Sequence, residues 1–206
     1  GADAEPPDHV GALAPRSALV LGRAVSIPDM NALASQVPGV RAVQTTWGWQ
    51  AVQQRPVVQC WYAGTPLEGA VIGRLRAMTE PTTPISAEPA NPLLAYLVLQ
   101  VRVDERASES EVLEQVFEVL GAEDNGLLRP EQLSVGQPLY RSQLSTDVLA
   151  VPGTVAIEFS AMVWLDRLGD LQWWLQDGYG ATPGIGAYFD FENGGVIVNG
   201  KARSLG

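Results

Sequence analysis

The chain has one cysteine, one histidine and few charged residues, and each shortage argues against a class of protein. A single cysteine excludes an internal disulfide, so cysteine usage does not indicate a compartment. The net charge is −10, with 13 basic and 23 acidic residues. This balance argues against a nucleic-acid-binding face, which needs clustered Lys and Arg. No apolar run approaches the roughly 20 residues of a membrane span.

The first residues, GADAEPPDHV, lack the charged and apolar regions of a signal peptide. They also lack an initiator methionine, so we expect a trimmed chain or a piece of a longer one. Residues 1–16 are Pro-rich and acidic, with few large apolar side chains. This composition predicts an extended arm or linker.

One pattern occurs twice in the chain. Residues 26–40, SIPDMNALASQVPGV, and residues 139–157, LYRSQLSTDVLAVPGTVAI, both predict a helix that runs into Val-Pro-Gly and then a strand. In the first copy Ser26 and Asp29 can form a capping box. In both copies proline ends the helix and glycine allows the reversal. Such a helix must fold back on the strand to bury its apolar stripe, which is α+β architecture.

The remaining periodicities give further elements. Alternation and β-branched content predict strands over residues 40–49, 57–62, 93–103 and 154–165. A 3.6-residue period predicts helices at 67–78 and 108–120, the second with a capping box of Ser108 and Glu111. Residues 166–186 are Gly-rich and are expected to form a long loop, and a C-terminal hairpin is expected around 192–195.

This order of elements predicts the fold class α+β. We expect two small sandwich units with mixed or antiparallel sheets covered by helices. The first domain is predicted over residues 17–88 and the second over 89–206. The second contains the long loop and the hairpin.

The sequence offers no catalytic cluster. His9 lies in the arm, where no second group holds it as a general base requires. Cys60 alternates with apolar neighbours and is interpreted as a buried strand cysteine. Four glutamates between 109 and 118 indicate a solvated helix face rather than convergent metal ligands. No HExxH, CxxC, GxSxG or Walker pattern occurs. We therefore expect no enzyme activity, no metal and no cofactor.

The six tryptophans are the one feature that the preceding patterns do not explain. Trp47 and Trp49 alternate on one strand, which fits either core packing or an interface. Trp173 and Trp174, followed by Tyr179, fall in the predicted loop. They favour a protein–protein contact or an anchor of the loop, because aromatic residues are enriched at interfaces. The alternative is a carbohydrate- or ligand-binding module that uses the same exposed aromatic side chains.

Several stretches together resemble one known family. These are LGRAVSIPDMNALASQVPGV, TTWGWQAVQQRPVV, SVGQPLYRSQL, AVPGTVAIE and AYFDFENGGVIVNG. They are similar to the C-terminal part of baseplate J-like proteins, and their order carries the resemblance along nearly the whole chain. These proteins are baseplate wedge components of contractile phage tails and extracellular contractile injection systems.

The resemblance implies a structural role without catalysis. The implied partners are other baseplate proteins, namely wedge, hub or spike and sheath-proximal subunits, and copies of the chain itself. The implied location is the assembled particle, with synthesis in the cytoplasm. The segment 166–180 departs from the family pattern by being longer and more aromatic.

Overall fold

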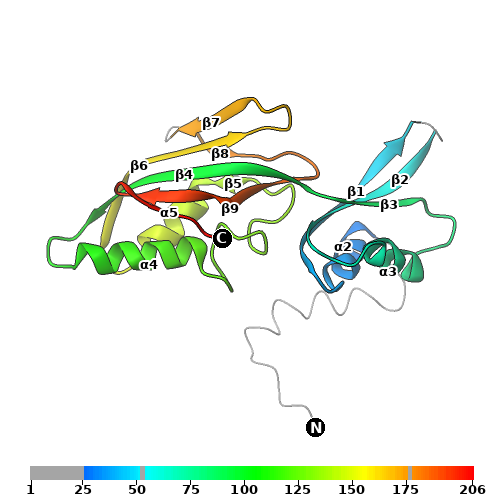
Figure 1. Ribbon diagram of the computed structural model, residues 1–206, viewed down its shortest axis with the longest axis horizontal. Helices are drawn as coiled ribbons and strands as arrows, with labels where there is room; N and C mark the ends of the chain where they lie inside the picture. The colour runs from blue at the N-terminus through cyan, green and yellow to red at the C-terminus, as the bar shows by residue number, and fades with distance from the viewer. Residues whose placement is uncertain (1–25, 52–53, 176–177) are drawn as a thin grey trace, which may run out of the picture. The chain divides into compact units, whose positions relative to one another are not determined.

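The protein has a mixed α/β structure, so the predicted α+β fold class is confirmed. The computed structural model describes residues 26–51, 54–175 and 178–206 (Figure 1). The predicted arm and His9 lie outside the described residues. The chain divides into two compact units, Gly1–Pro89 and Ala90–Gly206, which we call unit 1 and unit 2.

Unit 1 is a three-stranded sheet packed against two helices. In chain order its elements are α2 (Ile27–Ser35), β1 (Val40–Gln50), β2 (Arg55–Gly64), α3 (Ala70–Met78) and β3 (Ile85–Pro89). The strand order is β1-β2-β3; β1 and β2 are antiparallel, whereas β2 and β3 are parallel. Met30 and Leu33 from α2 and Leu75 from α3 meet Val58 and Cys60 of β2 in the core.

The corner between α2 and β1 follows from local sequence. The backbone N–H of Ser26 donates to Asp29 Oδ2 over 2.9 Å, and the Asp29 N–H donates to Ser26 Oγ, so the predicted capping box is present. After the helix, the Val40 N–H donates to the Val37 carbonyl over 3.0 Å. Gly39 makes this reversal with a φ of +88°, which disfavours any residue with a Cβ.

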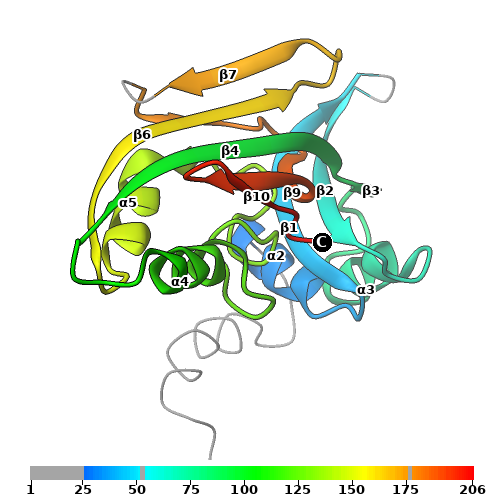
Figure 2. The ribbon, with the colours of Figure 1, turned by 60° about the vertical axis from the view of Figure 1, so that its left-hand side comes forward.

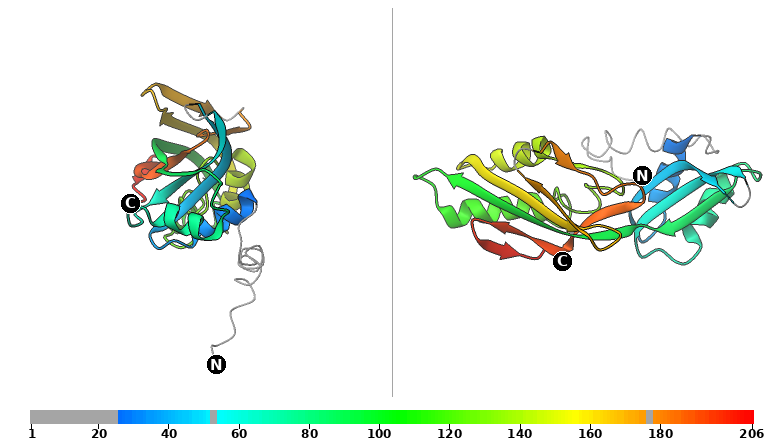
Figure 3. Two further views of the ribbon diagram at one scale, coloured as in Figure 1. Left: turned by 90° about the vertical axis from the view of Figure 1, so that its right-hand side faces the viewer. Right: turned by 90° about the horizontal axis from the view of Figure 1, so that it is seen from above.

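Unit 2 is a five-stranded sheet with two helices on one side (Figure 2). Its elements are β4 (Asn91–Val103), α4 (Glu109–Gly121), β5 (Leu139–Tyr140), α5 (Arg141–Leu149), β6 (Thr154–Leu165), β7 (Leu171–Leu175), β8 (Gly180–Ala181), β9 (Ala187–Val198) and β10 (Lys201–Arg203). The strand order is β10-β9-β4-β6-β7, and β4 with β9 is the parallel pair. The right-hand view of Figure 3 shows β4, β6 and β9 running side by side.

The core of unit 2 lies between the sheet and its helices. Leu97 and Leu99 of β4, Met162 of β6 and Phe189 of β9 are buried there with Val116 of α4. Trp164 packs edge-on against Phe189, with ring centroids 5.4 Å apart. Every buried residue of this core belongs to unit 2.

Two predicted features of unit 2 are wrong. The expected long loop contains β7, which pairs with β6 from Ala161↔Leu175 to Leu165↔Leu171. The expected hairpin is instead a bulge in one continuous strand, β9. Asp190 causes this, because its carboxylate accepts the backbone N–H groups of Glu192 and Asn193 and so satisfies them without a chain reversal. Consequently the register with β4 jumps from Leu94↔Asp190 to Tyr96↔Gly195.

The actual hairpin joins β9 to β10. Its turn residues, Asn199 and Gly200, have φ angles of +48° and +77°, as a tight hairpin turn requires. The Asn199 side chain also bonds both backbone groups of Val101, at 2.8 and 2.9 Å. The Asn199-Gly200 pair is the sequence signal for this turn, and the prediction missed it by placing the hairpin at 192–195.

Two helix starts also differ from expectation. α3 begins after Gly69, whose φ is +73°, and has no side-chain cap. The N-terminus of α4 follows Ser108, but the predicted capping box is absent, because no backbone N–H donates to that side chain. Ser108 Oγ instead lies 3.1 Å from Ser110 Oγ.

Candidate functional site

Trp47 and Trp49 lie exposed at the far end of the β1–β2 hairpin. Their exposed fractions are 55% and 64%. They are paired with Val58 and Pro56, and Val58 belongs to the core, so both tryptophans extend from the core side of the sheet. The hairpin projects past α2 and α3 (Figure 1), and the side chains of both tryptophans are exposed. The sequence left open whether these tryptophans pack in the core or form an interface. The prediction of packing in the core is therefore wrong.

Trp173 and Trp174 point to opposite faces of β7. Successive side chains of a strand alternate, so only one of these neighbours reaches the core. Trp174 is 5% exposed and belongs to the core of unit 2, whereas Trp173 is 64% exposed. The two residues, expected to act together in a loop, are thus separated by strand geometry. Trp174 is a packing residue.

Trp173 belongs to an apolar surface on the helix-free side of the unit 2 sheet. One row across the strands consists of Tyr96, Val163 and Trp173, which are direct cross-strand neighbours. Tyr96 is 43% exposed. We call this surface the outer face; its apolar members are exposed or half-buried and are Leu94, Tyr96, Val98, Phe159, Val163, Leu165, Leu171, Trp173 and Ile197. Sequence reasoning identified Trp173 but missed the other members, because strand pairing alone brings them together.

The two ends of the outer face are polar. Arg102 lies 3.6 Å from Glu158 at one end. At the other end Asp166 closes the turn between β6 and β7 by accepting the backbone N–H groups of Leu168 and Asp170, each at 2.9 Å. These bonds, chiefly the one from Asp170, hold the pKa of the Asp166 carboxyl below its ordinary value. The turn therefore keeps a negative charge beside the apolar surface.

Tyr179 lies apart from the outer face. Its side chain is 94% exposed, and the residue precedes the short strand β8, outside the five-stranded sheet. Its carbonyl accepts the Arg141 N–H over 3.1 Å, so the backbone is anchored while the ring remains in solvent. The structure therefore does not place Tyr179 on the same sheet face as Trp173.

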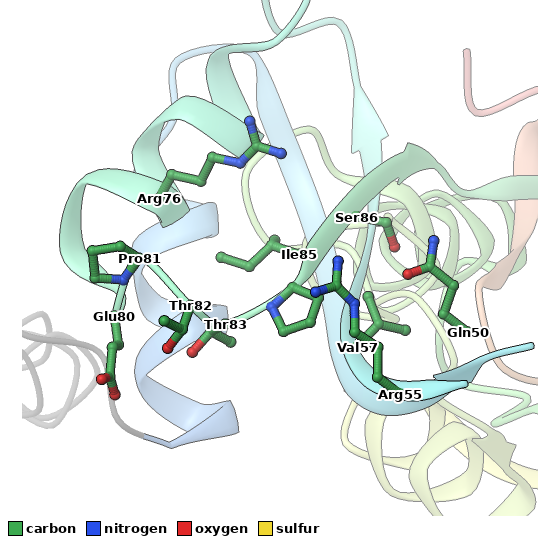
Figure 4. Close-up of a pocket in the computed structure, with 11 residues that line it drawn as sticks. Gln50, Arg55, Val57, Arg76, Glu80, Pro81, Thr82, Thr83, Ile85 and Ser86 are labelled. Carbon is green, nitrogen blue, oxygen red and sulfur yellow. The ribbon is translucent and has the colours of Figure 1, made fainter. Parts of the chain in front are cut away.

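Unit 1 has an open concavity of about 600 Å³ between the start of β2, the end of α3 and the start of β3 (Figure 4). Its charged lining residues are Arg55, Arg76 and Glu80, and the rest are polar or apolar. In Figure 4 the Arg76 and Glu80 side chains point in different directions. Among the described residues that line it, none is a cysteine or histidine, so these residues supply no thiol or imidazole for nucleophilic or acid–base catalysis.

Cys60 is 1% exposed, as expected for a strand cysteine. Burial raises the pKa of its thiol to about 11, so the thiol stays protonated at neutral pH. Among the residues that the structure describes, no three His, Cys, Asp or Glu side chains are grouped to hold a metal ion. In the described part of the chain, no helix is both long and apolar enough to cross a membrane.

The α4 glutamates lie on the solvent side of the helix. Glu109, Glu111, Glu114 and Glu118 are all exposed. Glu114 accepts two hydrogen bonds from Arg203, at 2.5 and 2.6 Å, and the Arg203 guanidinium also lies 4.4 Å from the centre of the Phe117 ring. Glu114 therefore links β10 to α4 through its ion pair with Arg203 and is not part of a carboxylate pocket.

No protein-family model matches the chain, and no curated protein matches it in sequence.

Proposed function

We propose that this chain is a structural subunit of a contractile particle, a baseplate wedge component of a phage tail or an injection system. It acts through protein–protein contacts and performs no reaction. The partners proposed are other baseplate proteins and copies of the chain. The proposed location is the assembled particle, after synthesis in the cytoplasm.

The observation that carries this proposal is the outer face. Large contiguous apolar patches are uncommon on monomeric proteins and usually mark contacts with other molecules. Here one strand row exposes Tyr96 and Trp173, and the next strand positions expose Leu165 and Leu171. Buried aromatic residues dominate the binding energy of many interfaces. The identity of the particle is supported by the ordered motifs that resemble baseplate J-like proteins.

The proposal is tested by replacing Trp173 with serine in the parent particle and counting complete particles by electron microscopy. We expect far fewer complete particles, because the contact loses its largest exposed side chain. The control is Leu149→Ser, since Leu149 is 45% exposed on α5, on the side of the sheet away from the outer face. Equal assembly of both variants would contradict the assembly role of this face.

A carbohydrate-binding module is the second candidate, and the exposure of the Tyr179 ring favours it. Sugars stack on exposed aromatic rings, so a glycan array would report this function directly. Binding to the array that Tyr179→Ala abolishes, together with normal assembly of the Trp173 variant, would replace the structural role.

A further inference from the structure

We infer that the outer face of unit 2 receives an amphipathic helix of a partner protein, whose apolar stripe is bordered by lysine and arginine. This inference rests on the proposed function, because it names the partner chemistry for the same surface. Three observations support it: the apolar character of both sheet faces, the spacing of the side chains, and the charge of unit 2.

The strands at the centre of this sheet are apolar on both sides. In β4, Ala95, Leu97 and Leu99 face the helices, and Leu94, Tyr96 and Val98 face outward. Near-continuous apolar runs of this kind are typical of strands covered on both faces. Within the described residues of unit 2, helices cover only one side of this sheet (Figure 2). A third layer from another molecule would complete the helix–sheet–helix arrangement.

The outer face has smaller side chains between larger ones. Ile197, Val98 and Ala161 form one row across β9, β4 and β6. On one side of this row lies the Tyr96–Val163–Trp173 row, and on the other side lies Phe159 opposite Gln100. The bordering rows are four residues apart along β4, or about 13 Å. A helix with its side chains is about 10–12 Å across, so a helix lying over the middle row contacts both bordering rows.

The charge of unit 2 favours a basic partner over a second copy. Residues 90–206 contain 16 acidic and 7 basic residues, whereas residues 26–89 contain four of each. On the described part of the outer face, Arg102 and Glu158 form an ion pair. A second copy would bring the same excess of negative charge, while lysine and arginine beside the apolar stripe would be attracted.

The test uses the full chain and two synthetic helical peptides with the same leucine stripe, one flanked by lysine and one by glutamate. Titration calorimetry measures their affinities, and hydrogen exchange locates them. We expect the lysine peptide to bind at least about tenfold more tightly, and to weaken as salt is added. The bound lysine peptide should slow amide hydrogen exchange in β4, β6 and β7.

Matched variants make the result specific to the outer face. Trp173→Glu should abolish binding of the lysine peptide, while Leu149→Glu on α5 should leave it unchanged. If Trp173→Glu fails to fold, Leu171→Glu serves the same purpose, since Leu171 is 64% exposed on the same face. Equal affinity for the two peptides, or undiminished binding to the folded outer-face variant, would overturn the inference.

The outcomes also separate this inference from the proposed function. A concentration-dependent dimer of the free chain that Trp173→Glu abolishes would make a second copy the occupant and overturn the helix. Impaired particle assembly without peptide binding would likewise overturn the helix and leave the assembly role intact. Normal assembly of the Trp173 variant would overturn both.

Discussion

Gly39 and Gly153 each complete a Val-Pro-Gly corner, with φ angles of +88° and +90°. Each corner also has the same turn bond, from the residue after glycine to the carbonyl of valine, at 3.0 Å in the first and 3.1 Å in the second. In both places four residues separate the end of the helix from the start of the strand. The two short sequences therefore produce the same local geometry in two separate cores.

At this scale we predict that Gly39→Ala destabilises unit 1 by about 2 kcal/mol, because a residue with a Cβ is strained in the left-handed region. The added Cβ would also lie 2.6 Å from the Thr65 carbonyl oxygen, which is backbone and cannot easily move. Urea-induced unfolding measures the change. Gly73→Ala is the control: it lies within α3 with open space around it and should stabilise by about 0.5–1 kcal/mol. Equal effects at the two positions would contradict the strain argument.

At the scale of the element, β7 determines which tryptophan has which role. Its pairing with β6 puts Trp174 opposite Met162 in the core and Trp173 opposite Val163 on the outer face. A loop would have imposed no such alternation. In this short strand Trp174 therefore contributes to stability, whereas its neighbour Trp173 lies where a partner can contact it.

We predict that Trp174→Ala lowers the free energy of unfolding by about 3–5 kcal/mol, because it removes a large side chain from a packed core. Trp173→Ala should change it by less than about 1 kcal/mol, since the residue is exposed. Denaturant unfolding of the two variants makes the comparison. A loss of stability that is the same for both would show that β7 is not paired as described.

At the scale of the whole molecule, the buried side chains form two separate cores. Within residues 26–51, 54–175 and 178–206, the buried members of the unit 1 core end at Ile85 and those of the unit 2 core begin at Leu93. β3 ends at Pro89 and β4 begins at Asn91, so the two sheets are consecutive in the chain but do not share a strand.

Two cores predict two independent unfolding reactions. Leu75→Ala, in the core of unit 1, should speed hydrogen exchange throughout unit 1 by an amount equivalent to about 2–5 kcal/mol. Exchange in unit 2 should not change. Leu97→Ala should have the reverse effect, because that side chain is fully buried in unit 2. If either variant sped exchange in both units equally, the chain would be one cooperative unit.

Short-range sequence patterns were enough to predict part of this fold. The Ser26 capping box and the helix stops before Gly39 and Gly153 depend on residues within a few positions of each other, so their spacing predicted them. The alternation of apolar residues in β4 likewise predicted which of its side chains face the core, such as Leu97. Cys60 was placed correctly because its apolar neighbours alternate with it.

The sequence alone determined the α+β class, the corner glycines and most of the helices, because these depend on short-range sterics and periodicity. Only tertiary structure decided that β9 bulges at Asp190, that Trp174 is buried while Trp173 is not, and which residues form the outer face. Each of these depends on hydrogen bonds between strands that are distant in sequence. A side chain's exposure in a sheet is set by the strand beside it, and that neighbour is chosen by the fold.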